Sequence, residues 1–300
     1  MPIREADPWR LQYFEGVACP ADVDIPTEDS DAWMWNPKNR WVNDKIAIAQ
    51  SQGLQAGPHG VTPPFFPVFS KPIVNLRGMG IGSQILRDDA EYRRHVTPGH
   101  MWMPLLEGKH VSSDVAVANG APHWWRHVTG VPAGEGTFDL WTVHAAADPA
   151  IETRCGEWFR KNLTGYTGIL NLETIDGTII EAHLRMSDQW PDLYGDGWVA
   201  ALVRFYQTGK WDYADRDRCD GFSVVLFGPK DRSYRHPPRL LVEEIRRMPG
   251  ISSVQITFHE DKELEAHAMP PGGFRLAIVN AWDLSAGKAA REALRAFFLR

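Results

Sequence analysis

The chain has 300 residues, of which 43% are hydrophobic and 23% are charged, as in a soluble globular protein with a full core. A formal net charge of −6 gives no support for a nucleic-acid or membrane-surface partner. No apolar run approaches the roughly 18–20 residues of a membrane span, and we recognise no signal peptide at the start. The three cysteines, Cys19, Cys155 and Cys219, are odd in number and far apart, which favours reduced thiols in the cytoplasm over a disulfide framework.

Turn residues and hydrophobic periodicity predict the elements of the first half. Residues 1–42 are rich in Pro, Asp and Trp and lack a strong helical period, so we expect an irregular segment. Asn43-Asp44 can cap a helix that Gly53 ends. The elements predicted next are a helix over 45–52, a loop over 57–67, a strand over 67–72, a glycine-rich loop over 77–83, a helix over 88–94, and strands over 100–107 and 111–119 that pair across Gly108.

The second half alternates in the same way. The predicted elements are strands over 124–129 and 138–145, an amphipathic helix over 149–163, a hairpin over 168–185, a helix over 197–207, a charged linker over 212–220, strands over 221–227, 254–258 and 274–280, and helices over 240–247 and 285–298. Helices and strands therefore interleave throughout, which predicts an α/β or α+β fold.

The predicted hairpin carries acid on one face. Leucines and isoleucines supply strand propensity on both sides of Asp176-Gly177, which is a strong turn signal. Because side chains of a strand alternate between its faces, an odd-length turn around Gly177 would place Glu173 opposite Glu181.

The return strand adds His183 and Arg185 to the face that holds Glu181. Two carboxylates with such neighbours suit Mg²⁺, which takes one or two carboxylates together with substrate phosphates. The alternative is a solvated outer face, since alternating charge is ordinary on an antiparallel sheet. The hairpin alone leaves both interpretations open.

A second group of candidates precedes the hairpin. Lys71 ends a strand before a loop that contains Gly78, Gly80 and Gly82. Glycines permit close backbone approach to a phosphate, and a nearby lysine neutralises its charge. Lys45 would add a second cation. The alternatives are a plain glycine turn and an exposed helix lysine.

The segment 101–110 is apolar and then abruptly polar. It could wrap an adenine and offer Glu107 and His110 to a ribose. The alternative is a buried hairpin with a polar turn.

The order of these motifs resembles the ATP-grasp superfamily over about residues 43–213. Asn43-Asp44-Lys45 and the segment 66–72 resemble the stretches with its two ATP lysines, and residues 105–114 resemble its nucleotide-linker and ribose stretch. Residues 168–173 and 180–185 resemble its metal-binding hairpin. Three features depart from the family: His183 stands where asparagine is usual, the hairpin is short, and the region before Lys45 is small.

The resemblance implies an ATP-grasp fold with a reduced N-terminal segment over 1–42, a nucleotide-binding domain over 43–213 and a small C-terminal α/β lobe over 214–300. It implies ATP and Mg²⁺ as cofactors. The residues implied to contact ATP are Lys45, Lys71, Gly78, Gly80, Gly82, Glu107 and His110, and the metal ligands implied are Glu173, Glu181 and, as a poorer match to a hard cation, His183. Lys71 and Arg185 are the implied catalytic residues, with Arg185 at the γ-phosphate or acylphosphate.

The implied reaction joins a small-molecule carboxylate to an amine through an acylphosphate. Two alternatives stay open at this point, a small-molecule kinase on the same fold and a catalytically silent nucleotide-binding or partner-binding protein. The sequence specifies neither the substrates nor a role for the C-terminal lobe, and it leaves a homo-oligomer open.

Overall fold

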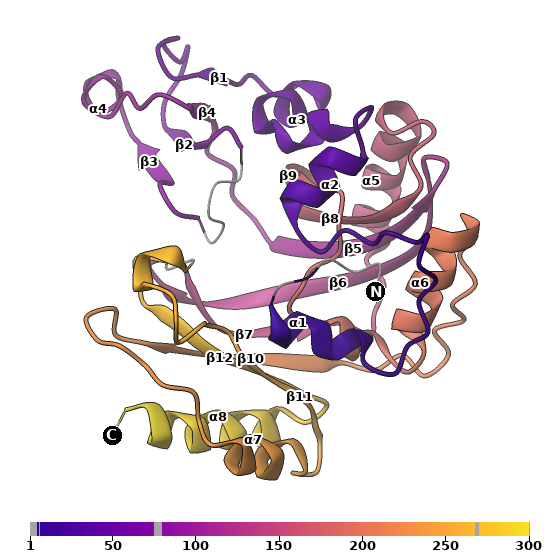
Figure 1. Ribbon diagram of the computed structural model, residues 1–300. Coiled ribbons are helices and arrows are strands. Elements are labelled where there is room, and N and C mark those ends of the chain that lie inside the picture. Colours follow the sequence, from indigo (N-terminus) through magenta and orange to yellow (C-terminus); the bar gives the residue numbers. More distant parts are fainter. Residues whose placement is uncertain (1–4, 6, 75–79, 268–269, 300) are drawn as a thin grey trace. The chain divides into compact units, whose positions relative to one another are not determined.

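The computed structural model describes residues 5, 7–74, 80–267 and 270–299 (Figure 1). The chain divides into two compact units. Unit 1 comprises Met1–Thr27, Arg126–Ala147 and Ser187–Arg300, and unit 2 comprises Glu28–Trp125 and Asp148–Met186. Each unit therefore combines stretches that are distant in the sequence. The predicted domain boundaries after residues 42 and 213 stay a prediction.

Unit 2 contains two antiparallel groups of strands. The four-stranded sheet has the order β1-β4-β2-β3, and these strands span Gly57–Pro58, His100–Pro104, Val68–Pro72 and Gln84–Leu86. The second group has the order β5-β8-β9, and its strands span His110–Ala118, Gly168–Ile175 and Thr178–His183. The helices of this unit are α2 (Asp29–Trp35), η2 (Arg40–Asn43), α3 (Lys45–Ser51), α4 (Asp89–Arg94) and α5 (Pro149–Asn162).

The core of the second group lies between its strands and the helices α3 and α5. Trp158 and Phe159 of α5 pack with buried leucines of β8, and Trp125 stacks on Phe159. The Trp158 Nε1 atom donates a hydrogen bond of 2.8 Å to Ser51 Oγ at the end of α3. This contact fixes both helices against the hairpin that carries the candidate site.

One predicted strand pair is wrong. β4 pairs with β1 and β2, whereas β5 pairs with β8, so the strands over 100–107 and 111–119 belong to different sheets. Gly108 is needed for a different reason than a hairpin turn. A Cβ atom at Gly108 would lie 2.2 Å from the side chain of Asp176, whose Oδ1 atom accepts a hydrogen bond of 2.7 Å from the Lys109 amide.

Local signals explain where several helices begin and end. Asp44 caps α3 by accepting hydrogen bonds from the amides of Ile46 and Ala47, as the sequence predicted.

The N-terminal segment is more regular than expected, because it contains α1 (Pro8–Leu11), η1 (Gln12–Phe14) and α2. These helices are short, and a helix of one or two turns shows little periodicity in a sequence.

Unit 1 is built on an antiparallel sheet of order β11-β12-β10-β7-β6. In this order the strands span Ile251–Ile256, Phe274–Ala281, Gly221–Gly228, Thr137–Val143 and Ala121–Gly134. The last of them, β6, belongs to unit 2 up to Trp125 and to unit 1 from Arg126. The remaining elements are η3 (Pro191–Tyr194), α6 (Trp198–Thr208), α7 (Arg239–Arg246), η4 (Leu264–Ala266) and α8 (Leu284–Phe298).

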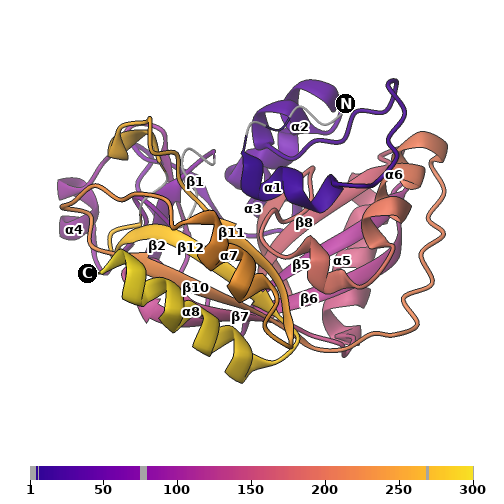
Figure 2. The same ribbon diagram turned by 60° about the horizontal axis from the view of Figure 1, so that its bottom comes forward.

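Helices α7 and α8 lie side by side along this sheet (Figure 2). α8 packs on β10 and β12, and α7 packs on β11. An aromatic cluster fills the space between the helices and the sheet, with Phe258, Phe274 and Phe298 almost fully buried. The predicted small α/β lobe therefore contributes these strands and helices to unit 1.

Two expectations from composition can be compared with the structure. None of the helices in the described parts of the chain has the length and apolar character to span a membrane. The three cysteines all lie among the described residues, and each is a free thiol there.

Candidate functional site

The hairpin of β8 and β9 places Glu173 directly opposite Glu181, as predicted. The reason differs from the prediction. Asp176 and Gly177 form a two-residue turn in which both have positive φ, at 44° and 74°. The register then shifts between Thr174 and Glu173, so that Ile180 is an extra residue in β9. This bulge, and not an odd-length turn, places the two glutamates opposite each other in the register of the strands.

Two buried lysines approach the hairpin at the bulge. Lys71 of β2 donates a hydrogen bond of 2.7 Å to the carbonyl oxygen of Ile180. Lys45, the first residue of α3, lies with its Nζ atom 3.2 Å from Glu181 Oε1. The lysines are only 5% and 6% exposed. Burial lowers the pKa of Lys71 to about 8, with Glu181 opposing this shift and Lys45 adding to it.

Beyond Glu181, side chains of alternating charge continue across unit 2. We call Lys45, Glu181, His183, Asp29 and Arg185 the charge chain. His183 Nε2 lies 3.2 Å from Glu181 Oε1, and His183 Nδ1 lies 2.9 Å from Asp29 Oδ1. Arg185 Nε lies 2.8 Å from the same Asp29 oxygen. The sequence of signs is positive, negative, positive, negative, positive, so each internal member has an opposite charge on both sides.

The charge chain favours the charged forms of His183 and Asp29. Burial and Arg185 lower the pKa of His183, but Asp29 and Glu181 outweigh them and raise it to about 9. Burial raises the pKa of Asp29, but Arg185 and His183 hold it well below its usual range. An imidazolium has no lone pair for a metal ion. While these contacts hold, His183 is therefore a donor between two carboxylates, and its assignment as a metal ligand stays a prediction.

The other carboxylate of the hairpin is more accessible. Glu173 Oε2 lies 3.1 Å from His110 Nε2, and both side chains are about one-third exposed, at 34% and 32%. Burial lowers the pKa of His110, but the hydrogen bond with Glu173 outweighs it and raises the pKa above its ordinary value. His110 thus lies beside the metal-binding candidates, and its predicted ribose contact is untested.

The two opposed glutamates fit a Mg²⁺ ion. Like charges directly opposite each other in a sheet are destabilising, and cross-strand partners have Cβ atoms about 4.5–5.5 Å apart. Here Lys45 beside Glu181 and the His110 ring nitrogen beside Glu173 offset part of that repulsion. Carboxylate oxygens are the hard donors that Mg²⁺ requires, so the chemistry of this pair agrees with the predicted metal site, which stays a prediction.

The remaining candidates from the sequence are less closely tied to this arrangement. Glu107 is exposed in the segment after β4. Gly80 and Gly82 have positive φ values of 65° and 81°, whereas Gly78 lies outside the described residues. In the segment predicted to wrap an adenine, Met101 and Met103 are core side chains with 0% and 2% exposure. Their burial agrees with the buried segment of the alternative interpretation, although the hairpin that it assumed is not formed, because β4 and β5 belong to different sheets.

Sequence reasoning missed Asp29. It lies in the first turn of α2, within the segment expected to be irregular, and 154 residues separate it from His183. The only local signal was a pair of acidic residues, Asp29 and Asp31, at the start of a short helix, which is an ordinary way to complement a helix dipole.

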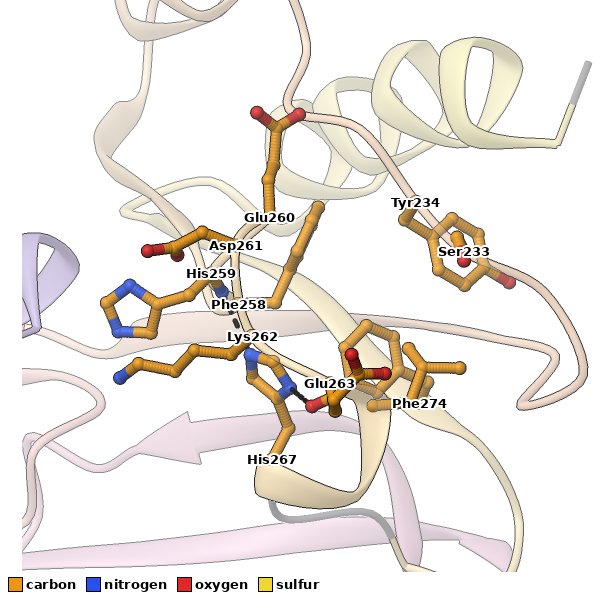
Figure 3. Close-up of a pocket in the computed structure, with 11 residues that line it drawn as sticks. Ser233, Tyr234, Phe258, His259, Glu260, Asp261, Lys262, Glu263, His267 and Phe274 are labelled. Atoms are coloured by element: carbon orange, nitrogen blue, oxygen red, sulfur yellow. Dashed lines mark hydrogen bonds between the residues drawn. The ribbon is translucent and has the colours of Figure 1, made fainter.

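A pocket of about 230 Å³ lies in unit 1 and contains none of these candidates. Figure 3 shows Tyr234 on one side of it and the imidazoles of His259 and His267 on the other. His267 Nε2 accepts a hydrogen bond from the His259 amide, and His267 Nδ1 contacts the Glu263 carbonyl. Both contacts lie within the loop that lines the pocket, from His259 to His267. They therefore explain the positions of the two imidazoles as part of the structure of this loop.

No protein-family model and no curated protein matches the sequence. Solved structures do match. L-amino acid ligase from Bacillus licheniformis is 12% identical with a TM-score of 0.63, over 96% of this chain and 82% of that one. Phosphoribosylamine–glycine ligase from Thermotoga maritima is 14% identical with a TM-score of 0.63, over 95% and 85% of the two chains. N5-carboxyaminoimidazole ribonucleotide synthetase from Thermus thermophilus is 14% identical with a TM-score of 0.58, over 97% and 84%.

These similarities define the fold. The chain has the mixed α/β fold of the ATP-grasp ligases, and this confirms the fold predicted from the order of motifs. At 12–14% identity the likeness carries the fold alone, so the roles of individual residues depend on the geometry described above.

Proposed function

We propose that the chain is an ATP-dependent ligase that activates a small-molecule carboxylate as an acylphosphate and joins it to an amine, with Mg²⁺. One observation carries the proposal. On an ATP-grasp fold, two buried lysines from separate elements meet a hairpin that presents two opposed glutamates. Lysine is almost never fully buried without a partner, and a cluster of this kind suits a polyphosphate with its metal ion.

The similar structures support the class of reaction. Those named above include an L-amino acid ligase and a phosphoribosylamine–glycine ligase, and a carboxyaminoimidazole ribonucleotide synthase from Aspergillus clavatus, also similar in structure, was solved with ATP.

The three free cysteines agree with the predicted cytoplasmic location.

In this proposal each charged group has a distinct task. Lys45 and Lys71 neutralise phosphate oxygens, and Glu173 and Glu181 hold Mg²⁺, which when bound would neutralise charge on the transferring phosphoryl group. Arg185 contacts that group through its planar fork of donors. His183 is the weakest of the proposed metal ligands because carboxylates face both of its nitrogens.

The nucleotide is tested first. A ligand at about 100 times its dissociation constant adds about 2.7 kcal/mol to the free energy of unfolding. Saturating Mg-ATP is therefore expected to raise the melting temperature, and calorimetry should detect binding. A melting temperature that does not move, together with no heat of binding, refutes the nucleotide site.

The reaction is tested next, with ATP, Mg²⁺ and pools of carboxylic acids and amines. A ligase releases ADP and free phosphate only when both substrates are present. Transfer of labelled γ-phosphate to a stable hydroxyl product would identify a kinase instead. Binding of Mg-ATP without any ADP release across the pools would support the silent alternative.

A further inference from the structure

We infer that Asp29 is a positioning residue for the proposed phosphoryl-transfer site, and that its carboxylate holds Arg185 and His183 in place from the first turn of α2. The inference rests on the proposed function and adds to it a residue that lies outside the segments resembling the ATP-grasp motifs. It assigns a task to the N-terminal segment, for which the sequence suggested none.

The Asp29 carboxylate contacts the guanidinium of Arg185 at two points. Arg185 Nε lies 2.8 Å from Asp29 Oδ1, and Arg185 Nη2 donates a hydrogen bond of 3.2 Å to Asp29 Oδ2. On its far side, Arg185 Nη1 donates a hydrogen bond of 3.0 Å to the carbonyl oxygen of Met186. A planar guanidinium held along two edges has a fixed orientation, which a single point contact would not provide.

The same carboxylate also orients His183. Asp29 Oδ1 lies 2.9 Å from His183 Nδ1, and the opposite ring nitrogen faces Glu181. The side chains of His183 and Arg185 are only 5% and 16% exposed, so water reaches them poorly. Without the Asp29 carboxylate, Nε and Nη2 of Arg185 and Nδ1 of His183 would lose the partner that they share. Asp29 therefore fixes the arrangement at the end of the hairpin where Arg185 has to meet its phosphoryl group.

The contact itself is tested without any assumption about the reaction. Asp29→Asn, Arg185→Gln and the double variant are compared with the wild type by thermal unfolding. Because the two side chains interact directly, the double variant should lower the melting temperature by clearly less than the sum of the two single variants. Additive losses would show that Asp29 does not hold Arg185, and would overturn the inference.

The positioning role is tested by turnover and nucleotide affinity. Asp31→Asn is the matched control, because Asp31 lies in the same first turn of α2 and undergoes the same change of charge. Asp29→Asn should keep its affinity for Mg-ADP within about threefold and lower ATP turnover by about 10–100-fold, since small misplacements of a catalytic group have effects of this size. Asp31→Asn should change neither.

Three results would overturn the role. Unchanged turnover in Asp29→Asn would show that Arg185 needs no support, and increased turnover would show that Asp29 blocks Arg185. A loss of ADP affinity equal to the loss of turnover would indicate general structural damage. In each of these cases the wild type is still active, so the proposed ligase function is not refuted.

If the wild type binds Mg-ATP but releases no ADP, the ratio of its affinities for ATP and ADP is measured in place of ATP turnover. A positioned Arg185 that contacts the γ-phosphate gives a preference for ATP, which Asp29→Asn should lose and Asp31→Asn should keep. An unchanged preference in Asp29→Asn overturns the role. A wild type that binds neither nucleotide refutes the proposed function together with this inference.

Discussion

Replacing each glutamate of the hairpin by glutamine should give variants that are equally inactive but unequally stable. Glu181 faces Lys45 and His183, whose side chains are 7% and 5% exposed, whereas Glu173 faces His110 at a site where both partners are about one-third exposed. Removing one partner of a buried ion pair costs about 3–5 kcal/mol, because it leaves a buried charge without compensation. An exposed pair contributes about 0–1 kcal/mol.

The lower end of the buried range applies to Glu181→Gln, since His183 keeps Asp29 at its other nitrogen. For a chain of 300 residues the unfolding entropy is about 0.6 kcal/mol/K, so about 1 kcal/mol moves the melting temperature by about 1.6 °C and a loss of about 3 kcal/mol lowers it by about 5 °C. Glu173→Gln should shift it by no more than about 2 °C. If both glutamates bind Mg²⁺, each variant should lower turnover by about 10²–10³.

The assay is thermal unfolding without nucleotide or Mg²⁺, followed by ATP turnover with both present. The two measurements separate the fold from the chemistry, since only turnover should respond equally to the two variants. Equal shifts of the melting temperature in Glu181→Gln and Glu173→Gln would refute the burial argument. Full turnover in either variant would refute its role as a metal ligand.

Two further predictions follow from buried titratable groups. Burial lowers the pKa of Lys71 to about 8 from 10.5, so the folded state binds fewer protons than the unfolded state between these pH values, and the stability of the wild type relative to Lys71→Met should rise with pH through that window. Denaturant titrations at about pH 7.5 and pH 9.5 measure this difference, and parallel pH profiles would show that Lys71 is not buried. Burial also raises the pKa of Cys155 to about 12, whereas Cys219 is exposed, so a thiol reagent should label Cys219 in the native protein and Cys155 only after unfolding. Rapid labelling of Cys155 under native conditions, located by mass spectrometry of peptides, would contradict its buried position.

Much of the local structure follows from the sequence because short-range rules decide it. The Asp176-Gly177 turn, the strands on either side of it and the cap at Asp44 each depend on neighbouring residues, and all three are present in the structure. The order of motifs along the chain was also sufficient to predict the fold, and the similar solved structures confirm that prediction. The facing of Glu173 and Glu181 was predicted correctly, although for the wrong reason.

Long-range contacts decided the rest. The bulge at Ile180 presents its carbonyl oxygen to Lys71, a residue 109 positions away, and no local pattern marks it. The strand after Gly108 looked like the return of a hairpin, because a glycine needed for the close approach of Asp176 cannot be distinguished in sequence from a glycine needed for a turn. Asp29 resembled any acidic residue at the start of a helix until folding brought it to His183 and Arg185. Sequence by itself determined the hairpin and the charged residues that it carries, whereas only the tertiary structure decided which distant charges contact that hairpin, because opposite charges buried from water interact through space regardless of their separation along the chain.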